Sequence, residues 1–201
     1  MGGFIRRDDP ARSEYLVAED LRLAYPAGLL VQTFENRKRG EALKMIHRFL
    51  DTNHDGILSP EEKRNARIIL YGHSWGGNAV IQLARDLQRE QIPVVFTVQV
   101  DSIGRRSNLV PPNVARAANF FQPDGLLHGG RKIRAADPSR TEIIGNFEIA
   151  YKKRQLNCVH YPWYERLFAK THTQIACDPA VWSQVELLIR SELPGPHSIA
   201  Q

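Results

Sequence analysis

The sequence predicts an α/β fold in which a mostly parallel, doubly wound sheet carries helices on both faces. Apolar runs of strand length alternate along the chain with segments of helical period, and this alternation is typical of parallel sheets. The run at residues 92–101 is rich in β-branched side chains and almost continuously apolar, as expected for an interior parallel strand buried on both faces. We therefore expect one domain over residues 1–193 and a loose tail over 194–201.

The individual elements follow from hydrophobic periodicity and from turn residues. Helices are expected where apolar residues recur at helical spacing, at residues 13–24, 39–50, about 75–89, 113–118 and 179–193. Strands are expected where apolar residues are nearly continuous, at residues 29–34, 68–71, 92–101, 119–122 and 141–149. The Gly, Asn and Pro content of residues 102–112 predicts a loop, and residues 161–164 form an aromatic loop.

The most informative junction is the sequence Gly-His-Ser-Trp-Gly-Gly at residues 72–77, between an apolar run and a helical segment. Gly-x-Ser-x-Gly in that context is the pattern of a nucleophile elbow, which exposes the serine oxygen above the sheet. Gly72 and Gly76 lack a Cβ, so the backbone can turn sharply and the helix can lie close to the strand. The alternative is a Gly-rich β-to-α turn in another doubly wound sheet.

With these residues the chain resembles the α/β-hydrolase family, in particular its small lipase-like and esterase-like members. The resemblance implies that Ser74 is a nucleophile and that an acid and then a histidine follow it along the chain. His172 lies in an expected loop just ahead of the last helix and is the favoured base, with His128 and His160 as alternatives.

Two aspartates compete for the role of the acid that orients the histidine. Asp101 ends the strand after the elbow helix, where an unpaired buried carboxylate would be costly. Asp124 ends the next expected strand, but its Gln-Pro-Asp-Gly turn is itself a structural reason for an aspartate. We favour Asp101 and keep Asp124 as the alternative.

The resemblance also implies an oxyanion hole made by backbone amides. One amide is expected from Trp75 and a second from the loop containing Gly3. In this family that loop follows a central strand, and the strands at 29–34 and 68–71 are too apolar to serve as edges. We therefore expect an apolar strand of about five residues before Gly2.

A second motif occupies residues 51–62 and matches the EF-hand calcium loop at every specified position. The expected oxygen ligands are the side chains of Asp51, Asn53, Asp55 and Glu62, the Ile57 carbonyl and, through water, Ser59. The alternative is an Asx-rich loop closed by a capping box in which Glu62 reciprocates Ser59. A single loop lacks the usual EF-hand partner, so we expect a structural calcium ion rather than a sensor.

Composition limits the classes of partner. The net charge of +5 comes from short, scattered basic groups, and none is interleaved with aromatics as in single-strand binders, so nucleic acid is not expected. No apolar run approaches the length of a membrane span, and the oligomeric state is left open. The default expectation is a cytoplasmic protein, or a secreted or periplasmic one if a signal lies upstream. Cys158 and Cys177 match no metal spacing and are either two buried thiols or a disulfide.

The function expected from these features is hydrolysis of a carboxylic ester or thioester through an acyl-enzyme, with a small molecule as substrate. Acyl transfer to an acceptor other than water would use the same residues. The competing class is a non-catalytic, calcium-stabilised binding module.

Overall fold

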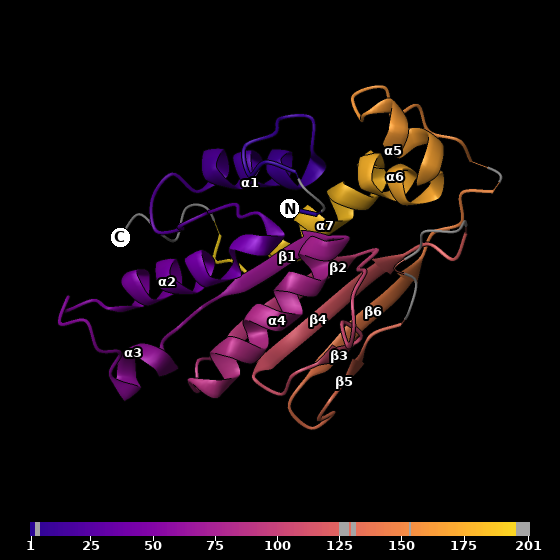
Figure 1. Ribbon diagram of the computed structural model, residues 1–201. Helices are drawn as coiled ribbons and strands as arrows, with labels where there is room; N and C mark the ends of the chain where they lie inside the picture. The colour runs from indigo at the N-terminus through magenta and orange to yellow at the C-terminus, as the bar shows by residue number, and fades with distance from the viewer. Residues whose placement is uncertain (3–4, 125–128, 130–131, 153, 196–201) are drawn as a thin grey trace.

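The structure is a computed structural model of the 201-residue chain, and it describes all residues except 3–4, 125–128, 130–131, 153 and 196–201. Its centre is a fully parallel sheet (Figure 1). The strands, in spatial order, are β1 (Ile69–His73), β2 (Val94–Val100), β4 (Val114–Phe121) and β6 (Glu142–Glu148). Two short strands, β3 (Leu109–Val110) and β5 (Arg134–Ala135), pair separately.

Helices cover both faces of this sheet, which confirms the α/β class (Figure 1). Successive residues of β4 show the two sides, because Ala118 belongs to one buried cluster and Ala117 to the other. The first cluster includes residues of α1 (Ser13–Ala24), α6 (Lys170–Cys177) and α7 (Pro179–Ser191). The second includes residues of α2 (Arg39–Leu50) and α4 (Trp75–Arg89), the helix that crosses from β1 to β2.

Three smaller helices complete the described elements: η1 (Asn36–Lys38), α3 (Pro60–Arg64) and α5 (Trp163–Phe168). None of the described helices combines the length and apolar character required to cross a bilayer. The expected helices at 13–24 and 39–50 coincide with α1 and α2. The tail from 196 onward lies outside the described residues.

The strand expected at residues 29–34 is absent, so that prediction was wrong. A strand requires a hydrogen-bonding partner, and a cavity of about 120 Å³ lies between β1 and this segment, lined by Phe34, Leu70 and Met1. The Phe34 carbonyl instead accepts a hydrogen bond of 3.0 Å from the Met1 ammonium group. The additional strand expected before Gly2 stays a prediction.

The helix at 113–118 was also predicted wrongly. Residues Val114–Phe121 form the single strand β4, which pairs with β2 on one side and with β6 on the other. Alanines at 115, 117 and 118 favour a helix in isolation, but two ladders of backbone hydrogen bonds override that preference. The expected loop at 102–112 contains β3, and the aromatic loop at 161–164 runs into α5.

Candidate active site

Ser74 occupies a sharp turn between the end of β1 and the start of α4. Its backbone has φ 58° and ψ −126°, in the positive-φ region that non-glycine residues rarely adopt. A Cβ on Gly72 would lie 2.7 Å from the Gly76 backbone carbon, so only glycine allows the strand and helix to approach this closely. The Ser74 amide donates to the Val100 carbonyl at 2.9 Å, which fastens the turn to β2.

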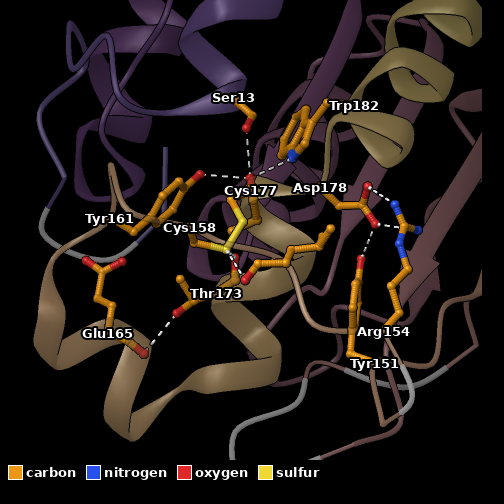
Figure 2. The surroundings of a disulfide bond; sticks show 12 residues. Ser13, Tyr151, Arg154, Cys158, Tyr161, Glu165, Thr173, Cys177, Asp178 and Trp182 are labelled. Atoms are coloured by element: carbon orange, nitrogen blue, oxygen red, sulfur yellow. Dashed lines mark hydrogen bonds and ion pairs between the residues drawn. A yellow bond between two sulfur atoms is a disulfide. The ribbon is translucent and has the colours of Figure 1, made fainter.

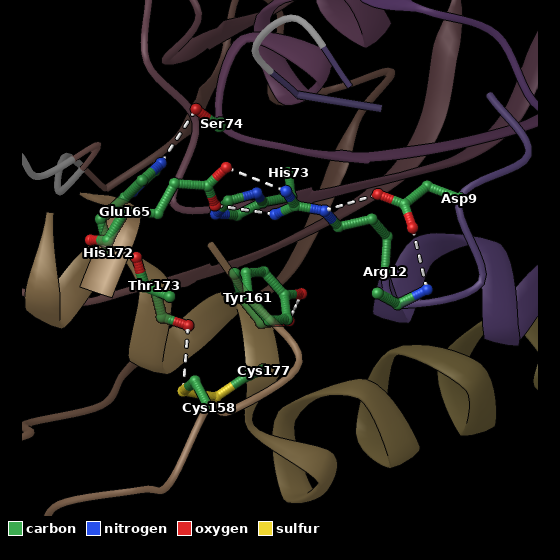
Figure 3. A network of polar contacts seen from close by, with 12 residues as sticks. Asp9, Arg12, His73, Ser74, Cys158, Tyr161, Glu165, His172, Thr173 and Cys177 are labelled. Atoms are coloured by element: carbon green, nitrogen blue, oxygen red, sulfur yellow. Dashed lines mark hydrogen bonds and ion pairs between the residues drawn. A yellow bond between two sulfur atoms is a disulfide. The ribbon is translucent and has the colours of Figure 1, made fainter. Parts of the chain in front are cut away.

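His172 lies between the serine and an aspartate. Its Nε2 is 2.9 Å from Ser74 Oγ and its Nδ1 is 2.6 Å from Asp101 Oδ2. Because an ionised carboxylate only accepts, Nδ1 carries the hydrogen and Nε2 is left to accept from the serine hydroxyl. Figure 3 shows the imidazole pointing toward Ser74. The histidine lies in α6 and not in the expected loop, because the segment that follows it buries Thr173 to Ala176 as a helix.

Asp101 is fully buried at the end of β2, and its carboxylate is held by several donors. Gln122 Nε2 donates at 3.1 Å and the Gly129 amide at 3.0 Å, in addition to the contact with His172. A buried carboxylate is stable only when its lone pairs are satisfied in this way. Sequence reasoning missed Gln122 and Gly129. The signal for Gln122 was a polar side chain ending an apolar strand.

The carboxylate of Asp124, the alternative acid, has partners other than His172. Its Oδ2 accepts from the Tyr151 amide at 3.1 Å and its Oδ1 lies 3.2 Å from Lys152 Nζ. Of the two other candidate bases, His160 is exposed at the surface, and His128 lies outside the described residues. Among the described residues, the groups in contact with one another are therefore Ser74, His172 and Asp101.

The backbone donors expected around the serine are only partly described. Trp75 begins α4, so its amide lies in the first turn of the helix, directly after Ser74. Gly3 lies outside the described residues. Its neighbour Gly2 packs against the elbow, since a Cβ there would lie 2.9 Å from Ser74 Cβ. Gly2 thus lies beside Ser74, and the second amide, from Gly3, stays a prediction.

His73 stacks on His172 inside the protein. The ring centroids are 4.5 Å apart and the planes differ by 29°, and His73 Nδ1 is 3.9 Å from Glu14 Oε1. Burial, followed by coulombic interactions with His172 and Arg12, lowers the pKa of His73 well below its ordinary value of 6.5. His73 is therefore a neutral ring that supports the imidazole of His172.

This neutral histidine makes stability depend on pH. Because the pKa of His73 is lower in the folded than in the unfolded state, the unfolded state takes up this proton first as the pH falls. The contribution of His73 to the free energy of unfolding is therefore present above pH 6.5 and is lost as the pH falls below that value. We expect His73→Phe to flatten the decline of unfolding free energy with acid in that window. Urea denaturation across the window measures the slope, with His160→Gln as an exposed control. Equal slopes for wild type and His73→Phe would contradict the assignment.

A disulfide anchors the helix that carries His172. Cys158 and Cys177 are bonded, with Cα atoms 5.9 Å apart, and Cys177 is the last residue of α6 (Figure 2). The preceding carbonyl, of Ala176, accepts hydrogen bonds of 2.8 Å from three side chains, those of Ser13, Tyr161 and Trp182. The end of α6 is thereby fixed to α1, to α7 and to the segment before α5.

Removing this crosslink is expected to cost stability and turnover together. For a bond between residues 19 apart in sequence, loop entropy predicts a loss of about 3 kcal/mol, or roughly 5–10 °C in Tm. Calorimetry on the double variant Cys158→Ser, Cys177→Ser measures the loss, and a reducing agent should reproduce it in the wild type. A wild type whose Tm is unchanged by reduction would contradict the expectation.

The EF-hand-like residues lie in the loop between α2 and α3 and in the first turn of α3. Their oxygens accept hydrogen bonds from groups of this same segment. Asp51 accepts from the amides of Asp55 and Gly56, at 3.1 and 3.0 Å. Glu62 accepts from the amides of Thr52 and Ser59, at 2.7 and 2.9 Å. Hydrogen bonds, first from the Ser59 backbone and then from Thr52, lower its pKa to about 2. The capping box expected as the alternative is present.

The ligand atoms that this loop offers are of the type that calcium prefers. All six predicted donors, those of Asp51, Asn53, Asp55, Ile57, Ser59 and Glu62, are oxygens. Gly56 has φ 82°, which a glycine adopts without strain. In the part of the chain that the structure describes, no group of three or more His, Cys, Asp or Glu side chains is arranged to hold a metal. The calcium site stays a prediction.

Calcium is expected to raise the melting temperature by a few degrees when it exceeds its dissociation constant, on the order of 10⁻⁴ to 10⁻³ M for a weak site. Glu62→Gln should abolish that rise while keeping the capping box, because glutamine also serves at this position. Glu61→Gln, one residue away on the same helix, is the matched control. A wild-type Tm that is equal in calcium and in chelator would count against the site.

Comparisons with protein-family models, with curated proteins and with solved structures found no match for this chain.

Proposed function

We propose that the protein is a serine hydrolase that cleaves a carboxylic ester or thioester of a small molecule through an acyl-enzyme. One observation carries the proposal: His172 bridges Ser74 Oγ and the buried carboxylate of Asp101, at 2.9 and 2.6 Å. A serine hydroxyl is a weak nucleophile unless a base of fixed tautomer removes its proton. The backbone of Ser74, held at positive φ between a strand and a helix, further supports a nucleophile elbow of the α/β-hydrolase type.

The reaction begins when Ser74 Oγ attacks the carbonyl carbon of the substrate and His172 Nε2 takes the hydroxyl proton. Asp101 stabilises the resulting imidazolium without itself taking the proton. The carbonyl oxygen becomes an oxyanion that accepts from the Trp75 amide at the start of α4. When the tetrahedral intermediate collapses, the bond to the alcohol or thiol breaks, and the leaving group takes its proton from His172.

Deacylation repeats these steps with water. His172 removes a proton from water, the oxygen attacks the acyl carbon, and the acid leaves as Ser74 Oγ recovers its proton from His172. An alcohol or amine in place of water would give acyl transfer by the same route. The stack of His73 on one side of His172 and the disulfide at the end of α6 both limit the movement of the base.

Two measurements distinguish this function from a non-catalytic binding module. With p-nitrophenyl acetate and with a short acyl thioester, a hydrolase should release product and give an acyl adduct on intact-mass analysis after rapid acid quench. Adding a primary alcohol tests transfer, because partition of the product to the new ester would identify an acyltransferase. Binding of the ester without product or adduct would favour the binding module.

A further inference from the structure

Helix α5 presents its apolar side chains to solvent. Five large apolar or aromatic residues, which we call the α5 patch, are exposed by half or more of their surface: Val159 (55%), Trp163 (65%), Tyr164 (51%), Leu167 (66%) and Phe168 (70%). None of the residues of α5 is buried. An ordinary surface helix turns its apolar stripe toward the core, so α5 has the opposite orientation. Contiguous exposed apolar surface of this kind marks an interaction site.

The orientation is fixed by the one acidic residue of the helix. Glu165 faces inward and receives two hydrogen bonds, of 2.8 and 2.9 Å, from the guanidinium of Arg12. Arg12 is only 5% exposed and also lies over the ring of Tyr161, 4.4 Å from its centroid. Thr173 Oγ1 donates to the Glu165 carbonyl at 2.9 Å, which joins α5 to α6. Rotating the apolar face inward would leave the buried Arg12 without this partner.

The patch borders the candidate active site. Only Ala169 separates α5 from α6, which carries His172, and the Glu165 carbonyl accepts from Thr173, the residue after His172. Trp75, directly after the nucleophile, is itself 44% exposed. A surface that docks on the α5 patch would therefore lie close to Ser74.

The positive charge around the patch favours an anionic partner. Residues 151–171 contain five basic residues, Lys152, Lys153, Arg154, Arg166 and Lys170, and a single acid, Glu165. Lys152 and Arg154 pair with Asp124 and Asp178. Arg166 and Lys170 are exposed and form no ion pair with any residue that the structure describes. Apolar and aromatic side chains rimmed by uncompensated cations are the composition of interfacial helices on anionic lipid.

We propose that the α5 patch docks on an anionic lipid surface, with its apolar side chains at the level of the acyl chains and Arg166 and Lys170 at the headgroups. The docking proposal is argued only from the exposed residues of the patch and does not depend on the proposed function. The corollary that the candidate site acts on an ester carried in that surface rests on the proposed hydrolase function.

The docking is tested by co-sedimentation of the full chain, as Ser74→Ala, with vesicles of phosphatidylcholine alone and of phosphatidylcholine mixed with phosphatidylglycerol. Binding to the mixed vesicles is expected. Leu167→Ser with Phe168→Ser should raise the lipid concentration for half binding roughly tenfold or more. Leu23→Ser with Leu187→Ser, which removes two equally exposed leucines from α1 and α7, is the matched control and should leave it unchanged. Arg166→Gln with Lys170→Gln should raise it by roughly 30-fold on mixed vesicles only.

Three results would overturn the docking proposal: no binding to either vesicle, equal loss in the patch and control variants, or self-association of the chain without lipid that the patch variant removes. The last would make a second copy the occupant. Turnover of two substrates separates action on a lipid-borne ester from the hydrolase proposal itself. The patch variant should lose hydrolysis of a vesicle-borne ester and keep that of p-nitrophenyl acetate. Absence of both activities in the wild type would refute the hydrolase and leave the binding result standing.

Discussion

Ser74→Ala is expected to lower kcat for a short p-nitrophenyl ester by roughly five to six orders of magnitude. In the proposed mechanism this variant lacks the attacking atom, and the Trp75 amide that remains can only stabilise charge on the carbonyl oxygen. His172→Ala should lower kcat by about as much, since a nucleophile and its base act as a unit. The measurement is kcat at saturating substrate for the two single variants and for the double variant.

The double variant is the control for this interpretation. If Ser74 and His172 act together through their 2.9 Å contact, the two losses are not additive, and the double variant should be little worse than either single one. Circular dichroism and Tm of Ser74→Ala should match those of the wild type, because the substitution removes only the hydroxyl oxygen. Wild-type turnover in Ser74→Ala would exclude it as the nucleophile.

Asp101→Asn is expected to lower kcat by roughly four orders of magnitude. The carboxylate now receives the Nδ1 hydrogen of His172 at 2.6 Å. An amide can turn its own donor toward that nitrogen, which favours the wrong tautomer and leaves Nε2 unable to accept from Ser74. The loss should therefore appear in kcat while KM for a small ester changes little.

Asp124→Asn is the matched comparison, because Asp124 is also a buried aspartate following a central strand. Its carboxylate bonds to the Tyr151 amide and to Lys152, and it forms no hydrogen bond or ion pair with His172. We expect Asp124→Asn to lower Tm, since a hydrogen bond to a charged group is lost. We expect kcat to stay within about tenfold of the wild type, since the contacts among Ser74, His172 and Asp101 are unchanged. If Asp124→Asn is the inactive variant and Asp101→Asn is active, the acid has been assigned to the wrong strand.

The sequence predicted those parts of the fold that depend on local patterns. The helices α1 and α2 were expected at their observed bounds, because amphipathic spacing and turn residues are local signals. The sharp turn at Ser74 was predictable from Gly72 and Gly76, because the close approach of strand and helix demands glycine at specific positions. The order of Ser74, Asp101 and His172 came from the family resemblance rather than from periodicity.

The remaining features depend on contacts between distant parts of the chain. The apolar run at 29–34 lacks a strand partner next to β1, and the alanines of β4 are held in a strand by two neighbours. The support of Asp101 by Gln122 and Gly129 arises only when the ends of neighbouring strands meet. Likewise, the inverted orientation of α5 depends on a salt bridge between Arg12 and Glu165, which are 153 residues apart.

Labelling with a fluorophosphonate probe, followed by mass spectrometry of the peptides, tests the activation of Ser74 without any assumption about the substrate. We expect a single adduct on Ser74 in the wild type, no adduct in Ser74→Ala, and labelling in His172→Ala that is slower by several orders of magnitude. Absence of labelling in the folded wild-type protein, or an adduct that persists in Ser74→Ala, would contradict the account.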